Sequence, residues 1–169
     1  MLKFRLYYDK DAEQDWLAKM SNRGYAFKNY ILGFYTFEEC EPGKYLYQID
    51  LLDDKADAYE EFCEFMKESG VEVVARWYRW VYLRKSASEG AFEMYTDNES
   101  KIDQYSRIRK FFSFFLVIET FGFFMEINAA IQTGKPLFWF FTLLIGTIAL
   151  AFLRITWKCS WKIEQLRRD

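Results

Sequence analysis

The chain has 169 residues, with 23 Lys and Arg against 25 Asp and Glu and a net charge of −2 at pH 7. It contains no histidine, which excludes Ser-His and Cys-His catalytic pairs and imidazole metal ligands. Residues 1–110 hold 17 Lys and Arg against 21 Asp and Glu, and this acidic balance argues against direct nucleic-acid binding.

Strand and helix patterns alternate along the first fifty residues. Residues 3–8 are predicted to form a strand, and Asp9 is placed to cap a helix that Gly24 ends. Residues 25–40 have strand composition with a turn or bulge at Gly33. The turn sequence at residues 41–44 precedes a strand with period-two alternation. Helix and sheet are therefore both expected in this region.

A second helix is expected after Asp53 or Asp54, either of which can cap it. Residues 71–77 and 78–85 are predicted as two strands or one long bent strand, and residues 91–95 as a short strand. The order βαββαβ predicts a ferredoxin-like α+β sandwich over residues 1–95, and we detect no internal repeat. The apolar face of the second helix holds Tyr59, Phe62, Cys63 and Met66.

Aromatic residues make up 21% of the chain and occur in both phases of the strands near residue 80. In a ferredoxin-like sandwich the helices cover one sheet face and leave the other open. The rings either fill a core, or they form an open face that a protein partner, the membrane or a small apolar ligand covers. The surface expected to bind a ligand or partner comprises Trp77, Tyr78, Trp80 and Tyr82.

Two apolar runs follow, residues 111–132 and 136–157. A helix of that length measures roughly 33 Å, enough to cross a bilayer core of about 30 Å. Residues 96–110 are predicted as a polar juxtamembrane helix and residues 158–169 as a basic tail. Lys and Arg concentrate in these flanks, so we expect a multi-pass protein of the cell membrane with both termini cytosolic.

Polar side chains interrupt the apolar runs. Glu119 and Glu126 are seven residues apart, which places both on one helical face. Three uses of this face remain open: packing within the hairpin or a homo-oligomer, contact with another membrane protein, and proton- or cation-linked transport. The expected intramembrane polar face comprises Glu119, Glu126, Asn128 and Thr142.

Reactive sites are sparse. Cys40, Cys63 and Cys159 are widely spaced, which favours free thiols over a disulfide framework or a metal site, and we expect no cofactor. An enzyme is not expected, because its acid–base groups would have to come from a block that a helix cap already explains. That block comprises Thr96, Asp97, Asn98, Glu99 and Lys101.

Several spaced segments resemble one bacterial family. They are residues 7–29 (YYDKDAEQDWLAKMSNRGYAFKN), 37–50 (FEECEPGKYLYQID), 82–85 (YLRK) and 96–110. The chain resembles the membrane-anchored family catalogued as domain of unknown function 2812. That resemblance implies a cytosolic domain followed by membrane helices, and a gene neighbourhood with PadR-type repressors that suggests a stress response. It implies no catalytic residues.

Two functions follow as hypotheses. The first is a membrane-anchored regulatory or sensory protein whose aromatic-rich cytosolic domain binds a protein partner or a small apolar ligand. The alternative is a small oligomeric membrane protein for transport or permeation that uses the intramembrane carboxylates. The size of the soluble domain favours the first, since a pore of two helices does not need it.

Overall fold

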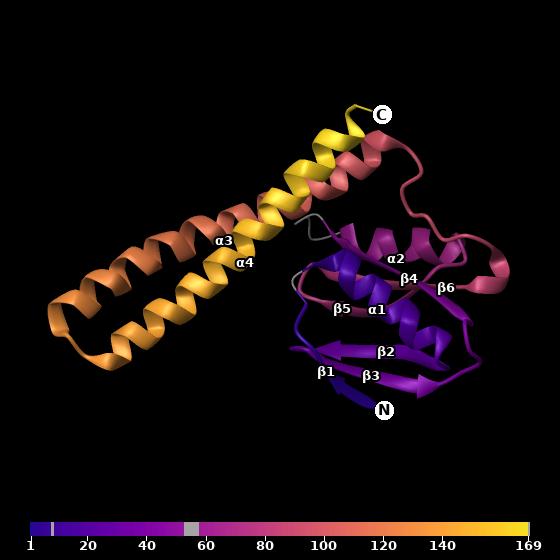
Figure 1. Ribbon diagram of the computed structural model, residues 1–169. Helices are drawn as coiled ribbons and strands as arrows, with labels where there is room; N and C mark the ends of the chain where they lie inside the picture. Colours follow the sequence, from indigo (N-terminus) through magenta and orange to yellow (C-terminus); the bar gives the residue numbers. More distant parts are fainter. Residues whose placement is uncertain (8, 53–57, 169) are drawn as a thin grey trace. The chain divides into compact units, whose positions relative to one another are not determined.

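A computed structural model describes residues 1–7, 9–52 and 58–168. The chain divides into two compact units, Met1–Thr96 and Asp97–Asp169. The first contains all the strands and the second is a pair of long helices (Figure 1). The predicted α+β domain followed by a helical hairpin is therefore confirmed. The expected cap at Asp53 or Asp54 lies outside the described residues.

The first sheet is built from β1 (Leu2–Phe4), β2 (Tyr25–Ile31) and β3 (Phe34–Glu39), which pair antiparallel in the order β1-β3-β2. Helix α1 (Lys10–Asn22) connects β1 to β2. Asp9 caps α1 as predicted, because its carboxylate accepts a backbone N–H of the first turn.

The second sheet is built from β4 (Tyr45–Leu51), β5 (Glu72–Trp77) and β6 (Trp80–Ser86), in the order β4-β6-β5. Helix α2 (Ala58–Glu68) connects β4 to β5. A single 3₁₀ turn, Ala87–Glu89, follows β6. Residues 91–95, expected to form a short strand, do not join either sheet.

The two halves of this unit repeat one connectivity. Each runs strand, helix, strand, strand, and in each sheet the first strand pairs with the third. Gly24 and Gly70 follow the two helices, and Leu32 and Tyr78 are the residues with positive φ in the turns of the two hairpins. The two glycines are separated by the same number of residues as the two turn residues. The irregular pairings in β2 and β5 are separated by the same number of residues. The structure therefore contains a repeat of connectivity that the sequence analysis did not predict.

Helices α1 and α2 cover opposite faces of the second sheet. Tyr82 belongs to the core cluster that contains α1 residues, whereas Leu83 belongs to the cluster that contains Met66 of α2. Successive residues of a strand point to opposite faces, so β6 is covered on both sides. Helix α1 contacts β2 and β4 and thus packs on strands of both sheets (Figure 1). The β4-β6-β5 sheet consequently lacks the open face expected from the sequence.

A bulge in β2 connects the two sheets. The pairing of β2 with β3 shifts after Phe27. The Phe27 N–H donates to the hydroxyl of Tyr47 at 2.8 Å, and the Phe27 carbonyl accepts from Arg84 at 3.3 Å. Side chains of β4 and β6 thereby satisfy backbone groups that the ladder leaves unpaired.

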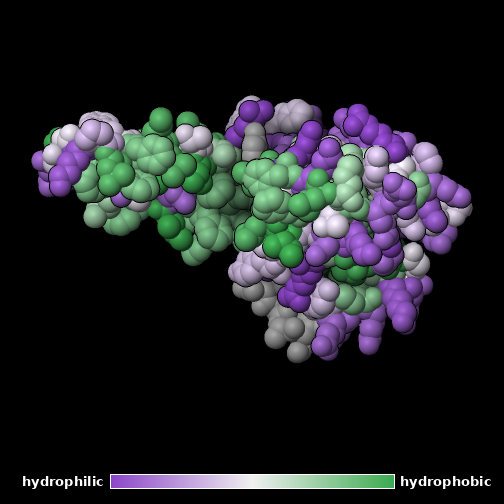
Figure 2. Space-filling model, turned by 90° about the horizontal axis from the view of Figure 1, so that it is seen from below, coloured by the Kyte–Doolittle hydropathy of each residue, from purple (hydrophilic) through white to green (hydrophobic). Residues whose placement is uncertain are grey.

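The second unit is a hairpin of α3 (Asn98–Thr133) and α4 (Pro136–Leu166). Gly134, in the left-handed conformation, ends α3. The predicted juxtamembrane helix and first span form one continuous helix. Both helices are long and apolar enough to cross a membrane. Figure 2 shows hydrophobic residues over most of the visible hairpin surface, with polar residues at its tip.

Candidate functional site

A carboxylate lies in the core of the first unit. Glu13 of α1 is 7% exposed. Its Oε1 accepts hydrogen bonds from the hydroxyls of Tyr35 on β3 at 2.6 Å and Tyr82 on β6 at 2.8 Å. One acidic side chain is thus held by both sheets.

The position of Glu13 on α1 explains its burial. Trp16, Leu17 and Met20 form the buried stripe of the helix, and Glu13 precedes them by three, four and seven residues. It therefore lies on the same face. Sequence reasoning missed it because an acidic residue in a first helical turn also suits the helix dipole. Helical periodicity was the signal that could have found it.

Aromatic rings surround the carboxylate. The Tyr30 ring lies 4.8 Å from Tyr35 and 5.3 Å from Tyr82, centroid to centroid. The Trp16 ring meets Tyr35 edge-on at 4.8 Å. We call the following set the Glu13 cluster: Glu13, Tyr7, Trp16, Phe27, Tyr30, Tyr35, Phe37 and Tyr82.

Burial dominates the electrostatics of this cluster. Desolvation raises the pKa of Glu13, and the hydrogen bonds from Tyr35 and Tyr82 offset only part of that effect. Burial, followed by the negative charge of Glu13, raises the pKa of both phenols well above their usual range. Within the described chain no salt bridge includes Glu13.

A cation of the chain lies on the rim of the cluster. The guanidinium carbon of Arg5 is 5.0 Å from the Trp16 ring centroid and 5.9 Å from that of Tyr7. Arg5 also donates to the Tyr7 hydroxyl at 2.7 Å, and its backbone N–H donates to the Gly33 carbonyl at 2.8 Å. The segment between β1 and α1 is thus attached to the β2–β3 turn.

The aromatic residues predicted as one binding surface are divided between two environments. Tyr82 is in the core, and Trp80 is half-buried against it. Trp77 and Tyr78 are exposed at the β5–β6 turn, where Tyr78 has a φ of 56°. Trp77 reaches the cluster only through an edge contact with Tyr30 at 5.9 Å. Of the four, Tyr82 alone contacts the carboxylate.

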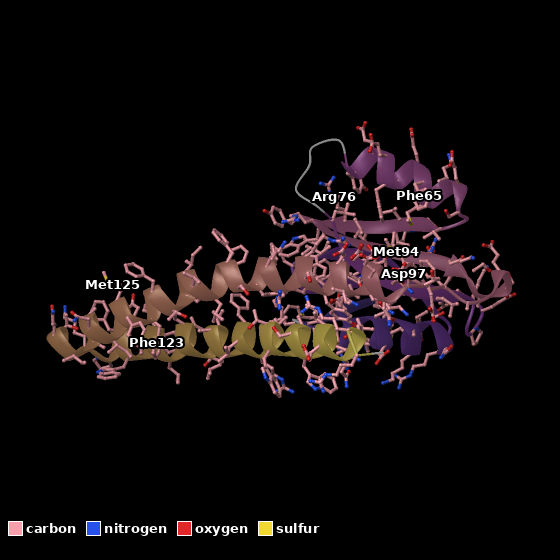
Figure 3. All side chains as sticks on the ribbon, turned by 90° about the horizontal axis from the view of Figure 1, so that it is seen from above. Phe65, Arg76, Met94, Asp97, Phe123 and Met125 are labelled. Carbon is pink, nitrogen blue, oxygen red and sulfur yellow. The ribbon has the colours of Figure 1, made fainter. Side chains whose placement is uncertain are left out.

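The outer side of β4 holds the segment that leads to α3. We call residues 91–96 the linker. Gln48 donates to the Phe92 carbonyl at 2.5 Å and accepts the Met94 N–H at 3.2 Å. The Tyr95 hydroxyl donates to Asp50 at 2.6 Å, and Asp50 is buried. Figure 3 shows Met94 on this segment shortly before Asp97.

Among the described residues, the four side chains of the predicted intramembrane polar face do not form one hydrogen-bonded network. Thr142 is buried and donates to a carbonyl of its own helix, while Asn128 accepts from Gln132 one turn away. Glu119 is half-buried, and Glu126 Oε2 is buried without a hydrogen-bond partner among the described residues. The threonine hydroxyls thus bond within their own helix.

An apolar groove of about 1010 Å³ follows the two helices of the hairpin. Its walls include Phe123 of α3, which Figure 3 labels, and Gly146 of α4. A β-carbon added to Gly146 would lie 2.9 Å from the Phe123 ring. The small residue therefore permits close helix contact there.

The family model described as "Protein of unknown function (DUF2812)" matches residues 9–117. The chain belongs to this family. The comparison with curated proteins found no match, and neither did the comparison with solved structures. The match includes the residues of the Glu13 cluster except Tyr7.

The DUF2812 match continues through the block at residues 96–101 into α3. Asp97 is the N-cap of α3, and its carboxylate accepts the Ser100 N–H at 2.8 Å. That hydrogen bond lowers the pKa of Asp97. Thr96, Asn98 and Glu99 are exposed and Lys101 is half-buried. Among the described residues, no three Cys, Asp or Glu side chains are grouped to hold a metal ion.

Proposed function

We propose that this chain is a membrane-anchored regulatory or sensory protein whose cytosolic α+β domain binds a small organic molecule at the Glu13 cluster. The observation that carries the proposal is the buried carboxylate among aromatic rings, with no charged partner in the described chain. A buried acid without a counterion lowers the stability of the folded protein, so stability does not explain its presence. Such groups are frequent at functional sites.

A single strand connects this cluster to the linker. Ile49 of β4 faces the core and is paired in register with Tyr82. Its neighbours Gln48 and Asp50 face the other way and hold the linker. A ligand that shifts Tyr82 therefore acts on β4, and β4 acts on the segment that continues into α3.

Membrane anchoring by α3 and α4 is part of the same proposal. Their length and hydropathy support it. Arg107, Arg109 and Lys110 before the first apolar run and the basic tail after the second support cytosolic termini. The stress-response role implied by the family resemblance would use this arrangement to report a chemical in the cytosol.

Native mass spectrometry of the full chain, released gently from the membrane, tests the proposal. We expect a reproducible small-molecule mass on the wild type that is reduced in Tyr82→Phe and retained in Tyr78→Phe, which removes a phenol hydroxyl from an exposed turn. Hydrogen exchange of residues 91–96 should slow when that molecule is bound. A wild type free of small molecules, or a Tyr82→Phe variant that keeps them unchanged, would contradict the proposal.

One observation favours the alternative, permeation through an oligomer. The unpartnered Glu126 Oε2 is the type of group that marks intramembrane ion pathways. If this function is correct, wild-type protein in liposomes carries protons down a pH gradient and Glu126→Gln does not. Glu164→Gln, outside the apolar run, is the control. Equal flux in wild type and Glu126→Gln would count against it.

A further inference from the structure

When Glu13 is ionised, no cation in the described part of the chain balances its charge. Its two hydrogen bonds come from neutral phenols and both reach Oε1. Hydrogen bonds from hydroxyls lower the cost of burying a carboxylate, but they leave its charge in place. A cation beside Glu13 would restore neutrality in the cluster.

The surroundings select the kind of cation. Tyr30, Tyr35 and Tyr82 lie around the carboxylate. The ring centroid of Tyr30 is 4.8 Å from that of Tyr35 and 5.3 Å from that of Tyr82. A strongly hydrated metal ion requires several oxygen ligands, which rings do not supply. Aromatic faces attract cations whose charge is spread over apolar substituents, as in recognition of quaternary ammonium groups. The cluster thus offers one charge and a wall of rings.

The chain already places a cation on this wall. The Arg5 guanidinium lies over Trp16 and Tyr7 at the rim, at 5.0 and 5.9 Å from the two centroids. Arg5 is exposed and makes no salt bridge with Glu13. It therefore occupies the outer rings without neutralising the inner acid. Its segment belongs to a connection between elements and not to a strand or helix.

We propose that the Glu13 cluster binds an organic cation, an ammonium or guanidinium group with apolar substituents. The cation lies between the Glu13 carboxylate and the rings of Tyr30, Tyr35 and Trp16, and it enters by displacing the segment Arg5–Tyr7. This inference rests on the proposed function and names the chemical class of its ligand. Arg5 acts as a tethered competitor that covers the cluster when no ligand is present.

Isothermal titration calorimetry on the full chain in maltoside detergent, with empty micelles subtracted, tests the charge requirement. The probes are benzyltrimethylammonium and neopentylbenzene, a neutral molecule in which carbon replaces the nitrogen. We expect the cation to bind at least about tenfold more tightly than the neutral molecule. This comparison uses only the wild type, so it does not depend on the folding of a variant.

Two variants locate the binding. Glu13→Gln should abolish the preference for the cation, whereas Asp15→Asn, which removes an exposed charge from the same helix, should keep it. Arg5→Ala should strengthen cation binding, because it removes the competitor. An unchanged preference in Glu13→Gln would overturn the assignment to this residue.

The outcomes separate the inference from the proposed function. Equal binding of both probes would overturn the cation requirement and leave a binding domain for neutral molecules. If benzyltrimethylammonium, phenylguanidinium and tetraphenylphosphonium all fail to bind below about 1 mM, the inference is overturned. If native mass spectrometry also finds no bound small molecule, the proposed function fails with it.

Discussion

The hydroxyl of Tyr82 lies 2.8 Å from Glu13 Oε1, although 69 positions separate the two residues in the chain. One comes from the helix of the first half and the other from the last strand of the second half. Their contact makes a polar centre that neither half can complete alone. The state of Glu13 therefore bears on the packing of the whole unit.

Loss of the Tyr82 hydroxyl should destabilise the protein. Tyr82→Phe leaves Glu13 with one phenol donor, and a buried polar group that loses a hydrogen-bond partner costs about 1–3 kcal/mol. Near-ultraviolet circular dichroism of the full chain in detergent, followed during heating, should show a lower midpoint. Tyr25→Phe, which removes a hydroxyl without a hydrogen bond among the described residues, should leave the midpoint unchanged. Equal midpoints for wild type and Tyr82→Phe would contradict the prediction.

Stability should depend on pH through Glu13. Its folded-state pKa is raised above the ordinary value of 4.5, so the folded protein retains this proton to higher pH than the unfolded chain. The stabilisation is present below that ordinary value and is lost as pH rises through the folded-state pKa. Glu13→Gln carries no charge and lacks this loss.

The measurement is the thermal midpoint of wild type and Glu13→Gln from about pH 4 to about pH 8. The difference should move in favour of Glu13→Gln as the pH increases. The phenols of Tyr30, Tyr35 and Tyr82 lie near Glu13, and burial raises the pKa of each above its usual range, so they do not titrate between these pH values. A constant difference across the range would show that Glu13 has no raised pKa.

A methyl group at Gly33 should displace the segment that covers the cluster. Gly33 has a φ of +85°, and an added β-carbon would lie 2.9 Å from Leu6 and Phe4 side chains and 3.0 Å from the Arg5 carbonyl. Gly33→Ala should therefore cost more than the about 1–3 kcal/mol of backbone strain alone. Gly43→Ala shares the positive φ but meets nothing closer than 3.4 Å. Equal losses of stability in the two variants would exclude the contact with this segment.

The linker should loosen when its hydroxyl anchor is removed. Tyr95→Phe deletes the 2.6 Å hydrogen bond to Asp50 and leaves a buried carboxylate with one fewer donor. We expect faster hydrogen exchange at residues 91–96, and unchanged exchange in β2, which lies in the other sheet. Unchanged exchange in the linker would show that the hydrogen bond between Tyr95 and Asp50 does not hold this segment.

Local patterns predicted most of the helices and strands, although the strand expected over residues 91–95 does not form. A side-chain oxygen at Asp9, the glycine after α1 and the turn residues around Gly33 all act within a few positions of the chain. The apolar runs predicted the hairpin helices for the same reason. In both cases, the signal and the structure it specifies lie in one stretch of sequence.

The repeat and the buried acid required contacts between distant residues. Counted back from the glycine after each helix, the position equivalent to Glu13 is Tyr59, and the hairpin position equivalent to Tyr35 is Val81. Equivalent positions of the two halves thus carry different side chains, so the repeat cannot be detected in the sequence. The burial of Glu13 depends on two phenols from other strands, which no local pattern can place.

The bulge at Phe27 also has a consequence for cooperativity. Its N–H and carbonyl, in a residue with no exposed surface, are satisfied by Tyr47 and Arg84 of the second half. If the second half were removed, both groups would lose their hydrogen-bond partners. Each group that stayed buried would then lower the free energy of unfolding by about 1–3 kcal/mol, and otherwise the core around it would be exposed to water. We therefore expect the two halves to unfold together. A molecule that binds at Glu13 would protect residues in both halves from unfolding, including those that contact it nowhere.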